Sequence, residues 1–125
     1  MKFLLDSNAF IWTYARPTEL STIARRALGD PANDRFVSMA STWEIAVKMS
    51  IGKLAFTSDL ASAIDDIAAT PLPITLAHIS RLQSLPFLHR DPFDRILVAQ
   101  AMEEGLTIVT RDRALKAYGV PILTA

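Results

Sequence analysis

The chain of 125 residues contains no cysteine. This absence excludes disulfides, thiolate zinc sites, iron–sulfur ligation and a cysteine nucleophile, and it suits a reducing cytosol. The net charge is zero, because thirteen Lys and Arg balance thirteen Asp and Glu. A strongly basic coat for nucleic acid is thereby excluded, whereas a local basic stripe is not.

Long apolar runs are also missing from the chain. No run reaches the roughly eighteen residues of a membrane span. Asp6 interrupts the N-terminal apolar run too early for a secretory signal. We therefore expect a cytoplasmic protein that does not associate with a membrane.

Apolar residues are nevertheless plentiful, since half of the chain is hydrophobic and the mean hydropathy is +0.25. A chain of this size buries roughly two-thirds of its unfolded surface, which predicts one compact domain over residues 1–125. The apolar content exceeds what such a core needs, so part of it is available to cover a partner. We expect a homodimer.

Strand and helix signals alternate along the chain. Short apolar runs predict strands at Lys2–Leu5, Arg35–Ser38, Leu106–Thr110 and Val120–Leu123, with a short extended piece at Pro71–Ile74. Capping residues and periodicity predict helices at Ala9–Tyr14, Ser21–Leu28, Ser41–Met49, Ser58–Ala69, Leu76–Leu85, Pro92–Glu104 and Asp112–Tyr118. The alternation indicates an α/β fold of three layers, α/β/α, around a central parallel sheet of four to five strands.

Acidic residues follow two of the predicted strands at their carboxyl ends. Asp6 comes directly after the first strand, and Asp112 lies two residues beyond the strand that ends at Thr110. The carboxyl edge of an open parallel sheet forms the ligand crevice, so these two carboxylates are expected to converge. Glu44 and Asp94, each in the first turn of a predicted helix, are the next candidates, because such helix starts face the same edge.

A cluster of carboxylates is stabilised by a cation bound among them. Acids within about 4–6 Å of one another repel, and at least one pKa rises unless a positive charge lies among them. Oxygen ligands without cysteine or a histidine pair favour Mg²⁺ or Mn²⁺ over zinc. Such a site can activate water and neutralise charge on a phosphodiester, which predicts metal-assisted phosphodiester hydrolysis.

Each acid also has a simpler structural interpretation. Asp6 can form a turn after its strand, and Asp91 is most simply the helix cap ahead of Pro92. Asp94 can complement a helix dipole, Glu44 can pair with Lys48 four residues on, and Asp112 can begin a helix. Taken singly, none of the last three is specific.

Four segments of the chain resemble a known family. They are LLDSNAFIW at residues 4–12, STWEIAVKMSIGKL at 41–54, HRDPFDRILVAQA at 89–101 and TIVTRDRAL at 107–115. In order and spacing they resemble the toxin branch of the PIN-domain ribonucleases, the VapC-like toxins of type II toxin–antitoxin modules. The resemblance spans nearly the whole chain, and four motifs in sequence are far more specific than one.

The resemblance implies a Mg²⁺- or Mn²⁺-dependent endoribonuclease that cleaves cellular RNA, with a cognate antitoxin encoded beside it. The four acids of the family match Asp6, Glu44, Asp94 and Asp112, which the resemblance implies to be catalytic metal ligands. Asp91 matches a frequent extra acid, which we expect to be the cap and an outer-shell partner, and Thr110 matches an accompanying hydroxyl.

One departure from the family concerns Ser7 and Asn8, which stand where this branch commonly has Thr-His. Ser7 keeps the hydroxyl, but Asn8 does not titrate, so a proton-transfer role of that histidine is not carried over. Both residues are retained as supporting residues. We expect activity to survive the change because the acids carry the metal.

Positive charge for RNA is present beside the acidic motifs. The candidate RNA-binding residues are Arg90, Arg95, Arg111, Arg113 and Lys48. For any single one of them, a solvated helix face is the simpler interpretation. His78 and His89 lack the serine and aspartate partners of a nucleophilic triad, so neither is given a catalytic role.

Three other functions make requirements that can be compared with the sequence. A receiver-type signalling domain would need an acidic pair after the first strand and a lysine after the last, but Asp6 stands alone and residues 120–125 contain no lysine. A haloacid-dehalogenase-type phosphatase would need an acid in place of Asn8. A PIN-like domain that binds RNA or a partner without cleavage remains open.

Overall fold

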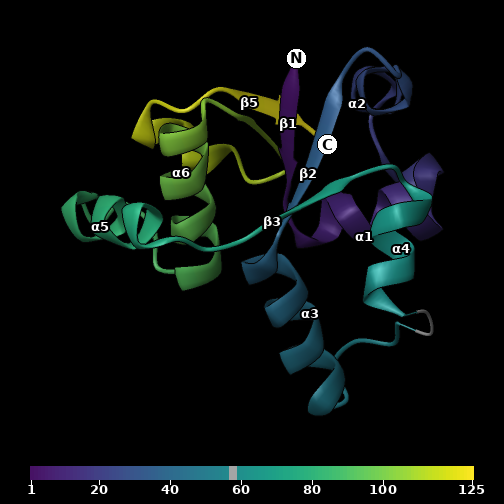
Figure 1. Cartoon of the computed structure of the whole chain (residues 1–125), viewed down its shortest axis with the longest axis horizontal. Helices are drawn as coiled ribbons and strands as arrows, with labels where there is room; N and C mark the ends of the chain where they lie inside the picture. Colours follow the sequence, from purple (N-terminus) through teal and green to yellow (C-terminus); the bar gives the residue numbers. More distant parts are fainter. Residues whose placement is uncertain (57–58) are drawn as a thin grey trace.

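The computed structural model of the chain describes residues 1–56 and 59–125. Its centre is a sheet of five parallel strands in the order β3-β2-β1-β4-β5 (Figure 1). The strands are β1 (Lys2–Leu5), β2 (Asp34–Ser38), β3 (Thr70–Leu72), β4 (Thr107–Thr110) and β5 (Ile122–Thr124). The expected parallel sheet is confirmed.

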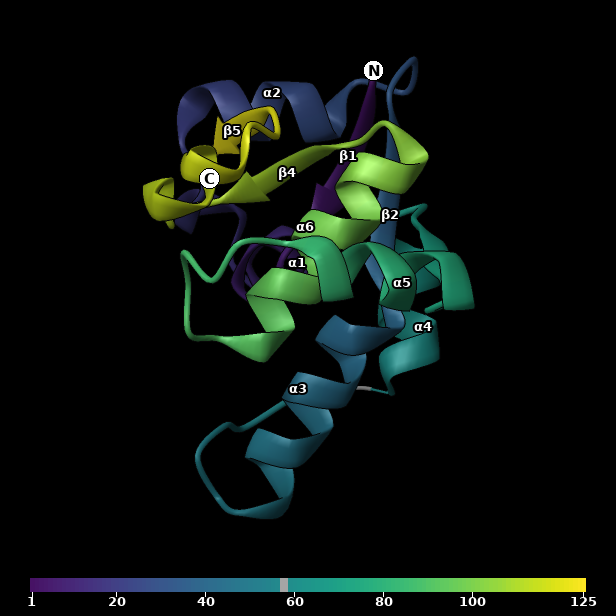
Figure 2. The same cartoon turned by 90° about the vertical axis from the view of Figure 1, so that its left-hand side faces the viewer.

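Helices cover both faces of this sheet (Figure 1). They are α1 (Ser7–Ala15), α2 (Thr22–Gly29), α3 (Met39–Ser50), α4 (Leu60–Asp66), α5 (Leu76–Ser84) and α6 (Pro92–Glu104), with 3-10 helices η1 (Pro17–Glu19) and η2 (Arg113–Tyr118). Helices α1, α2 and α4 lie on one side, α6 with η2 on the other, and α5 packs on α6. Figure 2 shows that α3 projects beyond the rest of the molecule. None of the described helices has both the length and the apolar character of a membrane span.

Strand β1 packs against the helix layers on both faces of the sheet. Successive side chains of a strand point to opposite faces. Phe3 and Leu5 therefore pack with Phe10 of α1, whereas Leu4 packs with Leu97 of α6. Because β1 is buried on both sides, its sequence reads as a continuous apolar run, as is typical of a central parallel strand.

Helix α4 is shorter than the helix predicted at Ser58–Ala69. Asp59 caps it by accepting a hydrogen bond from the Ser62 N–H at 3.1 Å, and the helix ends at Asp66. Ala68 has a φ of +54°, which is incompatible with a continuing right-handed helix. The predicted start at Ser58 lies outside the described residues.

Two other elements take a different form from the prediction. The extended piece at Pro71–Ile74 is a true edge strand, Thr70–Leu72, in which Pro71 pairs with Val37; an edge position tolerates a proline, which has no N–H to donate. The segment after Asp112 forms the 3-10 helix η2 rather than an α-helix.

The sheet order creates a switch point beside β1. From β1 the chain proceeds to β2 and β3 on one side, while β4 and β5 lie on the other. Leu5 pairs with Val109, and the Asp6 N–H donates to the Val109 carbonyl at 3.1 Å. The carboxyl ends of β1 and β4 therefore open onto one crevice, the usual ligand position of an open α/β sheet.

Candidate metal centre

A polar cavity of about 410 Å³ lies at this crevice. It brings together all four predicted acids and all four predicted supporting residues from distant parts of the chain. Its lining consists of Asp6, Ser7, Asn8, Trp12, Glu44, Lys48, Asp91, Asp94, Thr110, Arg111 and Asp112.

Asp6 and Asp112 are tied together through Thr110. One Asp6 oxygen caps α1 by accepting from the Ala9 N–H at 2.8 Å. The buried Thr110 hydroxyl donates to the Asp6 carboxylate and accepts from the Asp112 N–H at 3.0 Å. Asp112 in turn caps η2 by accepting from the Ala114 N–H at 3.0 Å. The two acids thus combine a local capping role with a place in the cavity.

Asp91 and Asp94 enter the cavity from the start of α6. One Asp91 oxygen accepts from the Phe93 N–H at 2.8 Å and from the Asp94 N–H at 3.3 Å. This bond confirms Asp91 as the cap, with Pro92 at the first helical position. Asp94 lies within the first helical turn and lines the cavity.

Glu44 arrives from the second turn of α3, not the first. The helix begins at Met39, because the Ser38 hydroxyl caps it by accepting from the Ala40 N–H at 3.0 Å. The Ser7 hydroxyl donates to one Glu44 oxygen at 2.5 Å, and Lys48 lies 2.9 Å from the other. The pair with Lys48 exists, and Glu44 lines the cavity as well. The hydrogen bond that Lys48 donates to Glu44 raises the pKa of Lys48.

Burial and, to a smaller extent, repulsion between the acids raise the pKa of two of them, Asp6 and Asp94. Burial raises the pKa of Asp6, opposed by the hydrogen bonds from Thr110 and Ala9. Burial, followed by repulsion from Asp91 and Asp6, raises the pKa of Asp94 to about 7. Five acids line the cavity (Asp6, Glu44, Asp91, Asp94 and Asp112) against two cations (Lys48 and Arg111), so its formal negative charge exceeds its positive charge. An all-oxygen donor set with this surplus charge fits a divalent cation such as Mg²⁺ or Mn²⁺.

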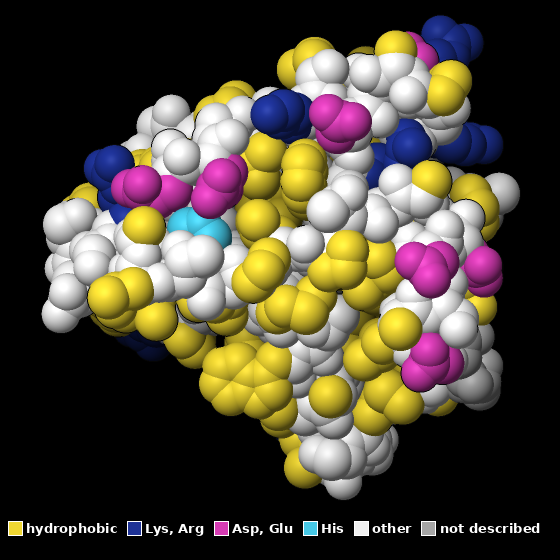
Figure 3. Space-filling model, in the orientation of Figure 1, with side chains coloured by type: hydrophobic (Ala, Val, Ile, Leu, Met, Phe, Trp, Pro, Cys, Tyr) yellow, Lys and Arg dark blue, Asp and Glu magenta, His cyan; other side chains and the backbone are white. Residues whose placement is uncertain are grey.

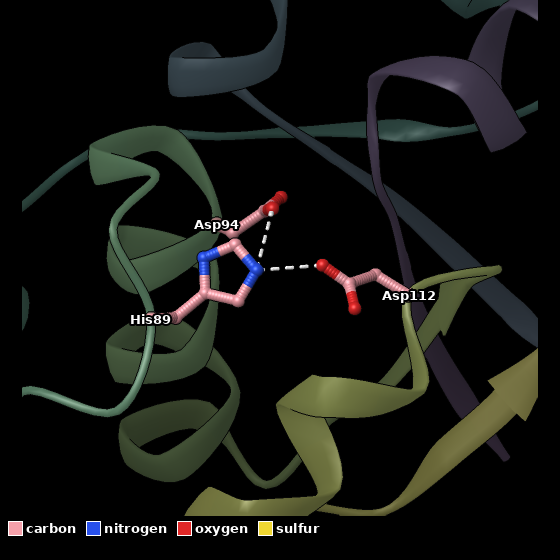
Figure 4. Close-up of side chains that lie close together, drawn as sticks. All are labelled: His89, Asp94 and Asp112. Atoms are coloured by element: carbon pink, nitrogen blue, oxygen red, sulfur yellow. Dashed lines mark hydrogen bonds and ion pairs between the residues drawn. The ribbon is translucent and has the colours of Figure 1, made fainter.

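His89 belongs to the site, although the sequence analysis gave it no role. Its Nε2 lies 2.6 Å from Asp112 Oδ2 and 3.8 Å from Asp94 Oδ2 (Figure 4). The potential ligand atoms of these three residues all lie within 4.8 Å of one another. The pattern of a nucleophilic triad does not identify His89, because its partners in this site are carboxylates. Its position two residues before the capping Asp91 was the available signal, because the loop that places that cap also places the histidine.

Two of the five predicted RNA-binding cations line the cavity. These are Lys48 and Arg111, and the Arg111 guanidinium lies 4.0 Å from the centre of the Trp12 ring. Arg111 also donates to the Glu19 and Ala125 carbonyls, which fixes it at the rim.

The other three cations lie outside the lining of this cavity. Arg95 donates to the Leu85 carbonyl at 3.3 Å and stacks over Phe87. Arg90 lines a neighbouring hollow, and Arg113 is exposed on η2. For Arg95 on α6 and Arg113 on η2, the rotation of the helix decides the direction of the side chain, whereas Arg90 lies in the loop before α6.

Carboxylates gathered around a crevice at the switch point of a parallel sheet define an α/β domain whose acidic site can hold a divalent cation. Comparison with known proteins identifies the family: the PIN domain matches residues 3–121. The chain is 30% identical to Ribonuclease VapC22 of Mycobacterium tuberculosis, over 94% of this chain and 92% of that protein. The chain belongs to the PIN-domain family, which confirms the resemblance seen in its motifs.

Solved structures show the same fold. VapBC2 from Rickettsia felis bound to a promoter DNA fragment matches with a TM-score of 0.73 and 14% identity, covering 98% of each chain. FitAcB from Neisseria gonorrhoeae matches with a TM-score of 0.66 and 20% identity, covering 98% of this chain and 96% of that chain. These similarities support the three-layer architecture.

Proposed function

We propose that the chain is the toxin of a type II toxin–antitoxin module and acts as a metal-dependent endoribonuclease. The observation that carries the proposal is the convergence of Asp6, Glu44, Asp94 and Asp112 on one cavity. The relative from M. tuberculosis, named a ribonuclease, supports the same activity. A receiver-type domain is not compatible with membership of the PIN-domain family.

The four acids would hold Mg²⁺ or Mn²⁺. When bound, such an ion lowers the pKa of a water nucleophile and neutralises charge on a phosphodiester oxygen. The side chains of the protein orient the acids and provide positive charge for the RNA. Asp6 and Asp112 are oriented by capping bonds and by Thr110. At the rim, Lys48 and Arg111 offer positive charge to the RNA backbone.

Cleavage of RNA by the purified protein tests the proposal. We expect cleavage of structured RNAs at their single-stranded segments in Mg²⁺ or Mn²⁺, and loss of cleavage in EDTA or in Asp94→Asn. Asp66→Asn, an exposed acid on α4, is the matched control and should cleave like the wild type. Cleavage that persists unchanged in EDTA and in Asp94→Asn would refute the proposal. RNA binding without cleavage by the metal-loaded protein would favour the binding-only alternative.

We propose that a cognate antitoxin covers the acidic cavity. Several of the solved structures with this fold are VapBC assemblies. A basic side chain of the partner placed among the acids would offset their repulsion, which adds to the effect of burial in raising the pKa of Asp94. Co-purification with the protein encoded by the adjacent gene, and inhibition of cleavage by it, is the expected result. A free, fully active toxin in its presence would contradict this proposal.

We propose that a second copy of the chain covers an exposed apolar face. Trp43 on α3 and Ile51, the residue that follows this helix, are 62% and 60% exposed, and Val47 lies between them. Beside them, an apolar hollow of about 290 Å³ runs between α3, α5 and α6. Figure 3 shows apolar side chains gathered over this region. An exposed apolar patch of this kind is typical of a protein–protein interface.

Light scattering at micromolar concentration tests the dimer. The wild type should have about twice the chain mass of 13.8 kDa. Trp43→Asp should be monomeric, whereas Ile23→Asp, an exposed apolar position on α2, should remain dimeric. A monomeric wild type, or a dimeric Trp43→Asp, would exclude this face as the interface.

A further inference from the structure

His89 is held in one tautomer by its own loop. Its Nδ1 lies 3.1 Å from the Asp91 backbone N–H. A backbone N–H only donates, so Nδ1 must accept. In the neutral ring the proton therefore lies on Nε2, which donates to Asp112 Oδ2 at 2.6 Å.

This tautomer separates His89 from the metal ligands around it. The Nδ1 lone pair is used by Asp91, and Nε2 carries a proton, so neither nitrogen is available to a cation in this arrangement. Within the close group that it forms with Asp94 and Asp112, His89 is therefore a hydrogen-bond donor to a carboxylate rather than a third metal ligand.

The hydrogen bond from His89 completes the support of Asp112. Oδ1 of Asp112 accepts from the Ala114 N–H, and Oδ2 accepts from His89. The Asp112 side chain is 38% exposed, so without His89 one of its oxygens would lack a hydrogen-bond partner among the described residues and the carboxylate could turn toward solvent. A continuous series of bonds thus joins the start of α6 to the start of η2. Figure 4 shows its middle bond, from His89 to Asp112.

We propose that His89 is a positioning residue that orients the Asp112 carboxylate toward Asp94 and thereby increases the affinity of the cavity for a divalent cation. The inference rests on the proposed function, because it takes the acidic cavity as the metal site. Outer-shell partners of metal-bound carboxylates commonly change metal affinity by about 10–100-fold when they are removed. The hydrogen bond from His89 joins the loop before α6, the helix that carries Asp94, to the segment that carries Asp112. It therefore acts on the relative placement of these two acids.

Two amide variants test the hydrogen bond to Asp112 separately from any effect on folding. His89→Gln extends its amide N–H₂ to about the place of Nε2, whereas the amide of His89→Asn is too short to reach Asp112. The full-length protein is titrated with Mn²⁺ alone, and free Mn²⁺ is measured by electron paramagnetic resonance. We expect the Mn²⁺ Kd to rise about tenfold or more in His89→Asn and to stay within about threefold of the wild type in His89→Gln. Leu88→Ala, in the same loop and half exposed, should leave the Kd unchanged.

The outcomes separate this inference from the proposed function. If the wild type binds Mn²⁺ no better than Asp94→Asn, the acidic cavity is not the metal site and the proposed function fails. If the wild type binds Mn²⁺, Asp94→Asn does not, and both His89 variants bind like the wild type, only the positioning role is refuted. An unchanged Mn²⁺ Kd with a raised KM for RNA would make His89 a substrate contact and would also overturn it. Equal losses in both His89 variants would refute the role of the bond to Asp112.

Discussion

Removing the charge of Asp94 is expected to stabilise the metal-free protein. The pKa of this carboxyl is about 7 in the folded protein against an ordinary value of 3.8. The folded state thus holds this proton more tightly than the unfolded chain, and stability falls as the pH rises from about 4 to about 7. At about 1.4 kcal/mol for each pH unit between the two pKa values, the penalty approaches about 4 kcal/mol at pH 8.

Two effects reduce the gain in Asp94→Asn. The Asp94 side chain is 20% exposed, so solvent screens part of the repulsion. The variant also loses a charge in the first turn of α6, which is worth roughly 0.3–1 kcal/mol. We expect Asp94→Asn to exceed the wild type in free energy of unfolding by about 2 kcal/mol at pH 8, and by less than about 1 kcal/mol at pH 5.

Urea denaturation in EDTA at the two pH values measures this difference. Asp66→Asn is the control, and a surface change of this kind should alter stability by less than about 0.5 kcal/mol. In saturating Mg²⁺ the order should reverse, because a ligand at 100 times its Kd stabilises the wild type by about 2.7 kcal/mol and Asp94→Asn lacks a ligand for it. An Asp94→Asn protein that is less stable than the wild type at pH 8 in EDTA would refute the electrostatic reasoning.

Three further changes test other parts of the site and its scaffold. Asp91→Asn keeps the capping oxygen but removes its charge, so the pKa of Asp94 should fall below about 7 in a carboxyl titration by nuclear magnetic resonance; an unchanged value would contradict the assigned repulsion. Thr110→Val removes the hydroxyl between Asp6 and Asp112, so the pKa of Asp6 should rise further and Mn²⁺ should bind more weakly, whereas wild-type affinity would show that this link is dispensable. Gly105→Ala places a side chain at a φ of +66° after α6, so urea denaturation should report a loss of about 1 kcal/mol, and no loss would mean that the backbone adjusts there.

The acidic cavity was largely predictable because it follows from a rule about sheets. Once the strands are recognised as parallel, their carboxyl ends lie at one edge, and Asp6 and Asp112 must approach each other. Asp91 was predictable as a cap because Asp-Pro at a helix start is a local pattern of backbone hydrogen bonding. Glu44 was placed one turn too early, since the helix was expected to begin at Ser41, whereas the Ser38 hydroxyl accepts from the Ala40 N–H and α3 begins at Met39.

By itself the amino-acid sequence determined the parallel three-layer fold, the family motifs and the edge at which the acids meet. These depend on periodicity, capping and chain order, which are local or topological properties. Only the tertiary structure decided that His89 donates to Asp112, 23 residues away, that Arg95 stacks on Phe87 outside the cavity, and that Trp43 is left exposed. Such contacts depend on how each helix is rotated and how a loop folds back, and packing across the whole molecule sets both.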